Sequence, residues 1–393
     1  MHPLPASPLG LVLVAAAITA CDDAPSGPTA SADLADSLAS PDTAAPPDTA
    51  ATDADAEATP PLLAADLLAA GPFRVGYRVF AHTYTPPGLP ERTIDVHLWY
   101  PTVATSAASH AVYEGFLPDE AALVDAPLAP PLDAARGYPV HAYSHGDLGF
   151  AGTSAFLMRH FASHGWVAVA PDHTGNTLTD QLNPRPNAIY HLRPSDITAA
   201  IDALAALPPE DPLAGLPDLE HVLLSGHSFG VHTCWATAGA TFDMAATEAT
   251  LGALEPADRA AFEASRHDPR VVAAIPMAGS IKRGLFGEGG HASVAIPMLA
   301  LSGTEDPVGA DAQFASSEDL DLTWVEVTGA CHQAFALGGC PELDDAEGFR
   351  LISVLALAFA RRHVLGDMRA ATLGILDGTR PLSARLAFRR HTP

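Results

Sequence analysis

The chain has 393 residues, of which 48% are hydrophobic, so it can bury the core of one large domain or two modest ones. Its 46 acidic residues against 20 basic ones give a formal net charge of -26, which disfavours attraction to nucleic acid or to anionic lipid. The composition therefore predicts a globular protein that does not bind polyanions.

The N-terminus resembles a bacterial export signal that ends at a lipid-attachment cysteine. The apolar run at 9–20 is too short to span a bilayer but suits the central region of a signal peptide. Residues 18–21, Ile-Thr-Ala-Cys, resemble a lipobox, in which the cysteine is acylated and becomes the first residue after cleavage. We expect residues 1–20 to be a signal peptide and Cys21 to anchor an exported cell-envelope lipoprotein to the membrane. Secretion after cleavage near Ala20 is the alternative.

A linker is expected at residues 21–61. Residues 22–60 consist mainly of Ala, Asp, Pro, Thr and Ser, with nine acidic residues and no basic one. Such a segment cannot bury enough apolar surface to offset its chain entropy, so we expect it to be disordered. Its prolines and like charges favour an extended spacer between the lipid anchor and a folded domain at 62–393.

The folded domain is predicted to be α/β, with a mostly parallel eight-stranded sheet and helices on both faces. Six of the eight predicted strands are apolar almost throughout, as is typical of parallel strands covered on both faces. The predicted strands are 73–80, 93–101, 138–146, 166–172, 221–226, 271–279, 296–303 and 322–329, and the predicted helices are 153–164, 194–206, 229–240 and 348–364. Pro194 and Asp196 are expected to begin the second helix.

The acidic, helix-favouring segment 241–270 forms a small insertion between the third helix and the sixth strand. It could be a cap over a pocket. A surface excursion without a role in binding is equally compatible with the sequence.

The motif Gly-His-Ser-Phe-Gly at 226–230 lies between a predicted strand and a predicted helix. In this context G-x-S-x-G is typical of a nucleophile elbow, a sharp turn that exposes one serine hydroxyl. Gly226 and Gly230 have no side chains to collide with the turn, and His227 and Phe229 flank the serine. The motif indicates that Ser228 is a nucleophile.

A serine nucleophile needs a base, and the base needs an acid to orient it. Asp306 and His332 follow the seventh and eighth predicted strands, so the order Ser228, Asp306, His332 is that of α/β hydrolases. Glu305 is the alternative acid. The histidines that compete with His332 for the role of base are expected to be structural; they are His145, His227, His232 and His291.

Acyl transfer also needs donors for the developing oxyanion. The backbone amide of Phe229, directly after the nucleophile, is the first candidate, and the amide of Asp147, in the loop after the third strand, is the second. An inward carboxylate would repel the oxyanion, so we expect the Asp147 side chain to point to solvent.

Five motifs occur in one order along the chain: SHGDLG (144–149), APDHTGNT (170–177), RPSDITAAIDAL (193–204), GHSFG (226–230) and DPRVVAAIPMAG (268–279). Together they resemble the α/β hydrolases known as predicted dienelactone hydrolases. That branch is similar to platelet-activating-factor acetylhydrolases and, more distantly, to cutinase-like polyesterases. The resemblance covers about residues 73–364 and implies a serine hydrolase of carboxylic esters that needs no metal or organic cofactor. True dienelactone hydrolases have a cysteine nucleophile where this chain has Ser228, so the substrate does not transfer with the resemblance.

An exported domain is expected to pair two of its cysteines. Cys331 and Cys340 flank His332 and are the favoured pair, since such a bridge holds the histidine loop in some cutinase-like relatives. Cys234 would then be a buried apolar residue. His160 and His164 have helical spacing but no third ligand is marked, so no metal is expected.

The predicted function is therefore an exported serine esterase that acts on small or lipid-like esters. An interfacial lipase or cutinase-like polyesterase would use the same three side chains, and the pocket would decide between them. A different class of protein, a surface binding lipoprotein that keeps the hydrolase fold without turnover, is the remaining alternative.

Overall fold

One mixed sheet runs through the part of the chain that the computed structural model describes, which is residues 59–181, 185–280 and 284–392. The predicted signal peptide, Cys21 and most of the predicted linker lie outside these ranges. Within them, eleven strands follow the order β11-β10-β9-β8-β7-β5-β6-β2-β1-β4-β3. Their bounds are β1 (Arg74–Tyr84), β2 (Arg92–Thr102), β3 (His110–Tyr113), β4 (Leu117–Val124), β5 (Tyr138–Ser144), β6 (Val167–Pro171), β7 (Pro217–His227), β8 (Val271–Met277), β9 (Met298–Gly303), β10 (Leu322–Val327) and β11 (Leu386–His391).

The centre of the sheet is parallel. Strands β6, β5, β7, β8, β9 and β10 pair with one another in parallel, whereas β2 joins β6 and β11 joins β10 in antiparallel fashion. Every residue of β5, β6 and β9 is buried, which explains why these strands are apolar almost throughout.

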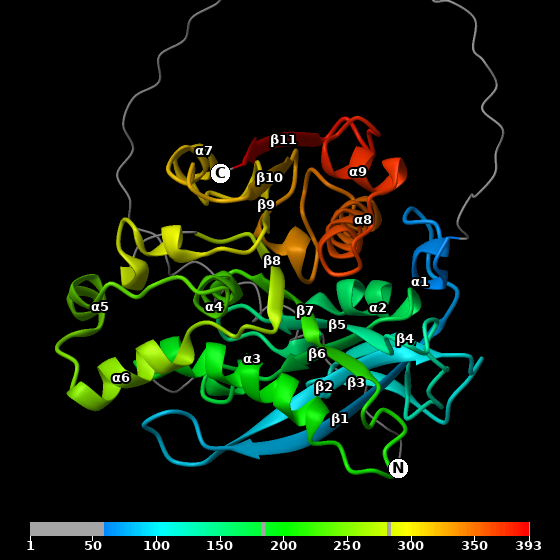
Figure 1. The fold of residues 1–393 in the computed structure, drawn as a ribbon, viewed down its shortest axis with the longest axis horizontal. Coiled ribbons are helices and arrows are strands. Elements are labelled where there is room, and N and C mark those ends of the chain that lie inside the picture. The colour runs from blue at the N-terminus through cyan, green and yellow to red at the C-terminus, as the bar shows by residue number, and fades with distance from the viewer. Residues whose placement is uncertain (1–58, 182–184, 281–283, 393) are drawn as a thin grey trace, which may run out of the picture. The chain divides into compact units, whose positions relative to one another are not determined.

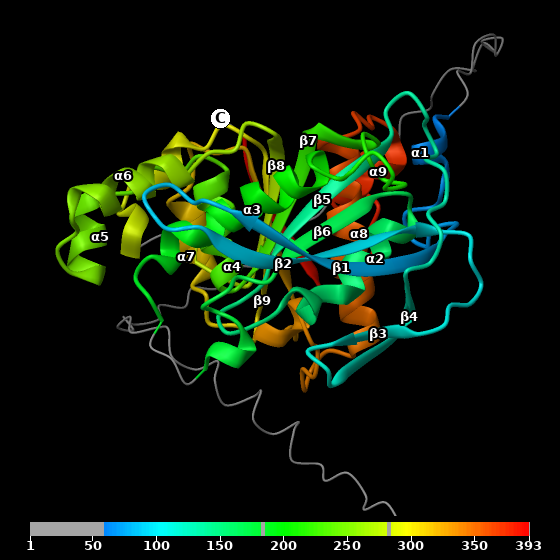
Figure 2. The same ribbon diagram turned by 90° about the horizontal axis from the view of Figure 1, so that it is seen from below.

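Helices cover both faces of the sheet. One core contains side chains of α2 and α8, and the other contains side chains of α3 and α4 (Figure 2). The helices described are α1 (Pro61–Ala64), α2 (Ala155–Ser163), α3 (Ile189–Ala205), α4 (Phe229–Thr237), α5 (Met244–Leu251), α6 (Pro256–Ser265), α7 (Ala310–Ala315), α8 (Asp345–His363) and α9 (Ala370–Leu376). None of them combines the length and apolarity that a membrane span requires.

The α/β class and the mostly parallel sheet are confirmed, but the count of eight strands is wrong. All eight predicted strands are present, and β3, β4 and β11 are additional. Strands β3 and β4 form an antiparallel pair at one edge of the sheet, and β11 lies at the other edge. Edge strands have a solvated side and mixed composition, so they lack the apolar run that marks the central strands.

The predicted start of the second helix is also wrong. Helix α3 begins at Ile189, and Pro194 lies inside it. Proline cannot donate a hydrogen bond to the carbonyl four residues earlier, which is that of Tyr190. In the structure this carbonyl accepts a hydrogen bond of 2.7 Å from Nε2 of His232 on α4. The side chain of a neighbouring helix therefore supplies the donor that Pro194 lacks.

The segment 241–270 folds as α5 and α6 (Figure 1). The Asp243 carboxylate caps α5 by accepting from the amides of Ala245 and Ala246 at 2.9 and 3.0 Å. Helix α6 is anchored by Phe262, which is buried and makes an edge contact with Phe242 at 4.9 Å between ring centroids. Residues of both helices therefore pack in the core that also contains side chains of α3 and α4.

Candidate active site

Ser228 occupies a sharp turn between β7 and α4. Its backbone has φ 56° and ψ -116°, a conformation that is strained for a residue with a side chain. The backbone N–H of Ser228 donates to the carbonyl of Met277 on β8 at 2.9 Å. A sharp strand-to-helix turn of this kind projects the serine side chain beyond the end of the sheet.

Two glycines allow the turn to close. A Cβ atom at Gly226 would overlap the carbonyl oxygen of Gly230, and one at Gly230 would overlap the carbonyl oxygen of Ser144 at the end of β5. The loop after β5 also lies directly against the nucleophile, since a Cβ at Gly146 would stand 3.2 Å from Cβ of Ser228. Close backbone approach is therefore the reason for glycine at these positions.

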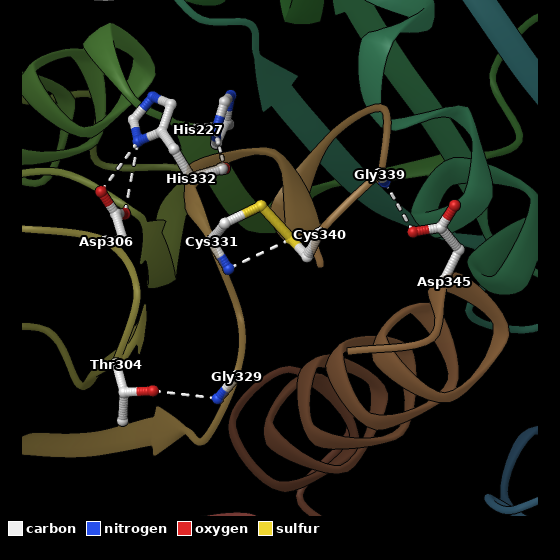
Figure 3. Close-up of a disulfide and its surroundings, with 9 residues drawn as sticks. All are labelled: His227, Thr304, Asp306, Gly329, Cys331, His332, Gly339, Cys340 and Asp345. Carbon is white, nitrogen blue, oxygen red and sulfur yellow. Dashed lines mark hydrogen bonds and ion pairs between the residues drawn. A yellow bond between two sulfur atoms is a disulfide. The ribbon is translucent and has the colours of Figure 1, made fainter. Parts of the chain in front are cut away.

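Asp306 and His332 are brought together by the ends of β9 and β10. Nδ1 of His332 lies 3.1 Å from Oδ1 and 3.3 Å from Oδ2 of Asp306 (Figure 3). The Asp306 side chain is 4% exposed and that of His332 is 26% exposed. Glu305, the alternative acid, accepts a hydrogen bond of 3.2 Å from the hydroxyl of Thr304 instead. The arrangement leaves Nε2 of His332 for another partner.

His227 links His332 to the nucleophile turn. Its Nε2 donates to the backbone carbonyl of His332 at 2.9 Å, and the two ring centroids are 4.8 Å apart. Burial lowers the pKa of His227 to about 3, so the ring is neutral at physiological pH. No hydrogen bond joins the Ser228 hydroxyl to His332 among the described residues. Such bonds are often long before substrate binds.

A disulfide joins Cys331 and Cys340, the pair that the sequence favours. It closes the loop that carries His332, and the backbone N–H of Cys331 contacts Sγ of Cys340 at 3.1 Å (Figure 3). Cys234 is free and buried on α4, and burial raises the pKa of its thiol. The bridge limits how far the histidine loop can move.

The Asp147 side chain is 34% exposed, so it reaches solvent in part, and two donors also hold it. Its Oδ1 accepts hydrogen bonds from Nδ2 of Asn176 at 2.7 Å and from Nη1 of Arg185 at 3.0 Å. These donors compensate the carboxylate, so it does not need full solvation to avoid repelling an oxyanion. The backbone amides of Asp147 and Phe229 take no part in the hydrogen bonds that connect the loops and turns of the described chain.

The other histidines have structural partners. Nε2 of His145 accepts from the backbone N–H of His173 at 3.0 Å, and Nε2 of His291 donates to the carbonyl of Ser316 at 3.0 Å. His232 bonds the Tyr190 carbonyl as described above. Each of these bonds uses a backbone group, so these histidines hold the chain in place.

The pair His160 and His164 has ring centroids 4.8 Å apart. Burial lowers the two pKa values to about 3 and about 4, and Nδ1 of His164 lies 3.2 Å from Nη2 of Arg361. In the described ranges no three His, Cys, Asp or Glu side chains are grouped so that they could hold a metal ion.

Sequence reasoning missed three side chains that surround the oxyanion candidates: Asn176, Arg185 and Arg193. Asn176 lies in the motif APDHTGNT and Arg193 in the motif RPSDI. Both motifs contributed to the family resemblance, but nothing in a single sequence shows that they meet at the loop after β5.

Comparison with known proteins identifies a similar family and a similar fold. The family profile described as Chlorophyllase matches residues 123–283. A solved ferulic acid esterase from Streptomyces cinnamoneus is 20% identical, with a TM-score of 0.58 over 83% of this chain and 98% of that chain. The search of curated proteins found no match. The fold and the family match place the chain in the α/β-hydrolase superfamily, among its carboxylic ester hydrolases.

Proposed function

We propose that the chain is an exported serine esterase in which Ser228 is the nucleophile, His332 the general base and Asp306 the residue that orients His332. The observation that carries the proposal is the His332–Asp306 hydrogen bond at 3.1 Å beside the strained turn of Ser228. The ring contact between His227 and His332 supports it, because His227 precedes the nucleophile.

In the proposed reaction, Oγ of Ser228 attacks the ester carbonyl carbon while Nε2 of His332 accepts the hydroxyl proton. Asp306 stabilises the resulting imidazolium through Nδ1. The amides of Phe229 and Asp147 donate to the oxyanion of the tetrahedral intermediate, a contribution worth several kcal/mol in comparable sites (roughly 3–4 kcal/mol per donor). Collapse of the intermediate expels the alcohol, which takes the proton from His332. Water, deprotonated by the same histidine, then hydrolyses the acyl-enzyme and releases the acid.

Carboxylic esters are the proposed substrate class. One structural neighbour is named a ferulic acid esterase, so esters with an aromatic acyl group belong in the first substrate panel. Chain-length profiling on p-nitrophenyl esters separates the esterase from the lipase or polyesterase alternatives, because activity confined to short acyl groups excludes an interfacial enzyme.

The decisive experiment measures ester hydrolysis and labelling by a fluorophosphonate probe in the wild type and in Ser228→Ala. We expect hydrolysis and labelling in the wild type, and loss of both in the variant. A wild type that neither hydrolyses esters nor takes the label would favour the binding lipoprotein that lacks turnover.

Export and lipid anchoring are part of the same proposal. The Cys331–Cys340 disulfide supports an oxidising compartment outside the cytoplasm. Cys21 lies outside the described residues, so its acylation rests on the lipobox resemblance. Metabolic labelling with a palmitate analogue should mark the wild type and not Cys21→Ser; a labelled Cys21→Ser protein would reject this anchor.

A further inference from the structure

Arg193 on α3 is a fully buried arginine whose hydrogen bonds all go to uncharged groups. Nη1 donates to Oδ1 of Asn176 at 2.6 Å, and Nε donates to Oγ1 of Thr233 at 3.3 Å. Nη2 donates to the hydroxyl of Ser144 at 3.2 Å and to the backbone carbonyl of His145. No carboxylate in the described ranges lies within ion-pair distance of this guanidinium.

A buried charge without a counter-ion is costly, because desolvation is not repaid by a salt bridge. Burial lowers the pKa of Arg193 to about 9, so the group still carries its proton at neutral pH. The carboxylates of Asp147 and Asp196 act on it only at longer range. Among the described residues, the fold therefore holds a positive charge at this position that has no ion-pair partner.

Arg193 is connected to both residues whose backbone amides are the proposed oxyanion donors. Its guanidinium carbon lies 4.6 Å from the ring centroid of Phe229, the residue that supplies the first amide. Asn176, which accepts from Arg193, donates in turn to the carboxylate of Asp147, the residue that supplies the second amide. One side chain thus contacts or bridges to both donor residues, which are far apart in sequence.

Arg193 also contacts the loop that carries the second amide, through the backbone carbonyl of His145. Nδ1 of His145 donates to the carbonyl of Gly146 at 2.7 Å, and Arg193 holds the carbonyl of His145 itself. Because the peptide unit between Gly146 and Asp147 is planar and trans, fixing the carbonyl of Gly146 fixes the opposite direction of the Asp147 N–H. Burial lowers the pKa of His145 to about 3, so its Nδ1 remains a donor in a neutral ring.

We propose that Arg193 is a positioning residue for the oxyanion site: it holds the two amide donors in register and places an unpaired positive charge beside the position where negative charge develops. This inference rests on the proposed function. The attraction between Arg193 and the oxyanion grows as the oxyanion forms, so Arg193 should stabilise the transition state more than it stabilises the bound substrate.

The test compares Arg193→Met and Arg193→Lys with Arg361→Met. Arg361 on α8 is the matched control, since it is equally buried, has no ion-pair carboxylate in the described ranges and donates to the backbone carbonyl of Ala65 at 2.8 Å. Both methionine variants remove a buried guanidinium, but only Arg193 borders the oxyanion candidates. Thermal unfolding, kcat, KM and the affinity for a phenylboronic acid are measured for each, with active sites counted by fluorophosphonate titration.

We expect Arg193→Met to lower kcat about 100-fold, the size of losing one oxyanion donor, while KM stays within about threefold. Boronic acid affinity should fall with kcat, because the boronate adduct resembles the tetrahedral intermediate. Arg193→Lys should recover about a tenth of the wild-type kcat, since lysine keeps the charge but loses the planar fork. Arg361→Met should lower the melting temperature and leave kcat per titrated site within about twofold.

An Arg193→Met enzyme with wild-type kcat per titrated site would overturn the inference, as would an equal loss in Arg361→Met. If Arg193→Met does not fold, Asn176→Leu breaks the link to Asp147 while Arg193 stays in place. That variant should lose about tenfold in kcat at unchanged KM, and unchanged kcat would overturn the inference. The proposed function fails separately, when the wild type shows no Ser228-dependent hydrolysis.

Discussion

Nδ1 of His332 lies 3.1 Å from the carboxylate of Asp306, whereas the adjacent Glu305 bonds the Thr304 hydroxyl and not the histidine. The two neighbouring carboxylates therefore have different hydrogen-bond partners, and of the two only Asp306 bonds the histidine. If Asp306 keeps His332 in the tautomer that accepts a proton at Nε2, Asp306→Asn should reduce kcat about 10⁴-fold without unfolding the protein. Steady-state kinetics on a short p-nitrophenyl ester measure this loss.

Glu305→Gln is the matched control for this prediction. It neutralises the next carboxylate along the chain but leaves the His332–Asp306 hydrogen bond in place. Its kcat should stay within about twofold of the wild type. A larger loss in Glu305→Gln than in Asp306→Asn would exchange the roles of the two acids.

Loss of the disulfide should lower both stability and turnover. The Cys331–Cys340 bridge joins two residues that are nine apart in the sequence, so it closes a short loop. Replacing both cysteines by serine should reduce the free energy of unfolding by about 2–3 kcal/mol, as expected for a short closed loop. Because the bridge borders His332, its loss should lower kcat by a larger factor than it changes KM. Urea unfolding and kinetics with and without dithiothreitol measure both effects; the reductant should affect the wild type and leave the double variant unchanged.

Gly230→Ala should abolish the folded active site. The added Cβ would overlap the carbonyl of Ser144, which lies at the end of a fully buried strand and cannot withdraw. We expect a loss of stability of at least about 3 kcal/mol, in the range of severe overpacking. Gly289→Ala is the control, because nothing lies within 4 Å of its added Cβ and its φ is -121°. Equal melting temperatures of the two variants would contradict the close packing of β5 against the turn.

Acid should destabilise the domain through its buried histidines. Burial lowers the pKa of His141 from 6.5 to about 3, so below about pH 6.5 the unfolded chain binds a proton that the folded chain excludes. The unfolding free energy therefore falls as pH drops from 6.5 towards 3. Asp196 opposes this in part, since burial raises the pKa of its carboxyl to about 6 and the folded chain takes up that proton first.

His141→Gln tests this dependence. Glutamine can retain a hydrogen bond to Ser225, which His141 contacts at 2.7 Å, but it does not titrate. Between about pH 4 and about pH 6 the slope of unfolding free energy against pH should decrease by up to about 1.4 kcal/mol per pH unit, the value for one proton. His110→Gln replaces an exposed histidine and serves as the control. An unchanged slope in His141→Gln would mean that His141 does not account for the acid sensitivity.

The central strands could be predicted from sequence because burial on both faces leaves a continuous apolar run. The edge strands could not, since β11 reads Leu-Ala-Phe-Arg-Arg-His and mixes charged with apolar residues. The start of α3 was missed for a different reason. A proline inside a helix is usually excluded by the orphaned carbonyl it creates, and the donor that satisfies Tyr190 comes from His232, on another helix.

The candidate site also contains some residues that could be predicted from the sequence and some that could not. Ser228 has a local signature, because the turn and its glycines are contiguous in sequence. The pairing of His332 with Asp306 followed from the shared edge of parallel strands. Arg193, Asn176 and Arg185 had no such signal, since their contacts with the loop after β5 are made between elements that are distant along the chain. Polar networks of this kind are specified by tertiary packing rather than by periodicity.

Strand β11 covers the outer edge of β10, the strand that leads into the His332 loop. A protein shortened before residue 386 would present the unpaired backbone of β10 to solvent, where a second molecule could add a strand of its own. Strand β11 is itself a short edge strand that carries Arg389 and Arg390, and charged side chains on an edge oppose the addition of another strand. Any fusion or trimming near β11 therefore has to leave residues 386–391 intact.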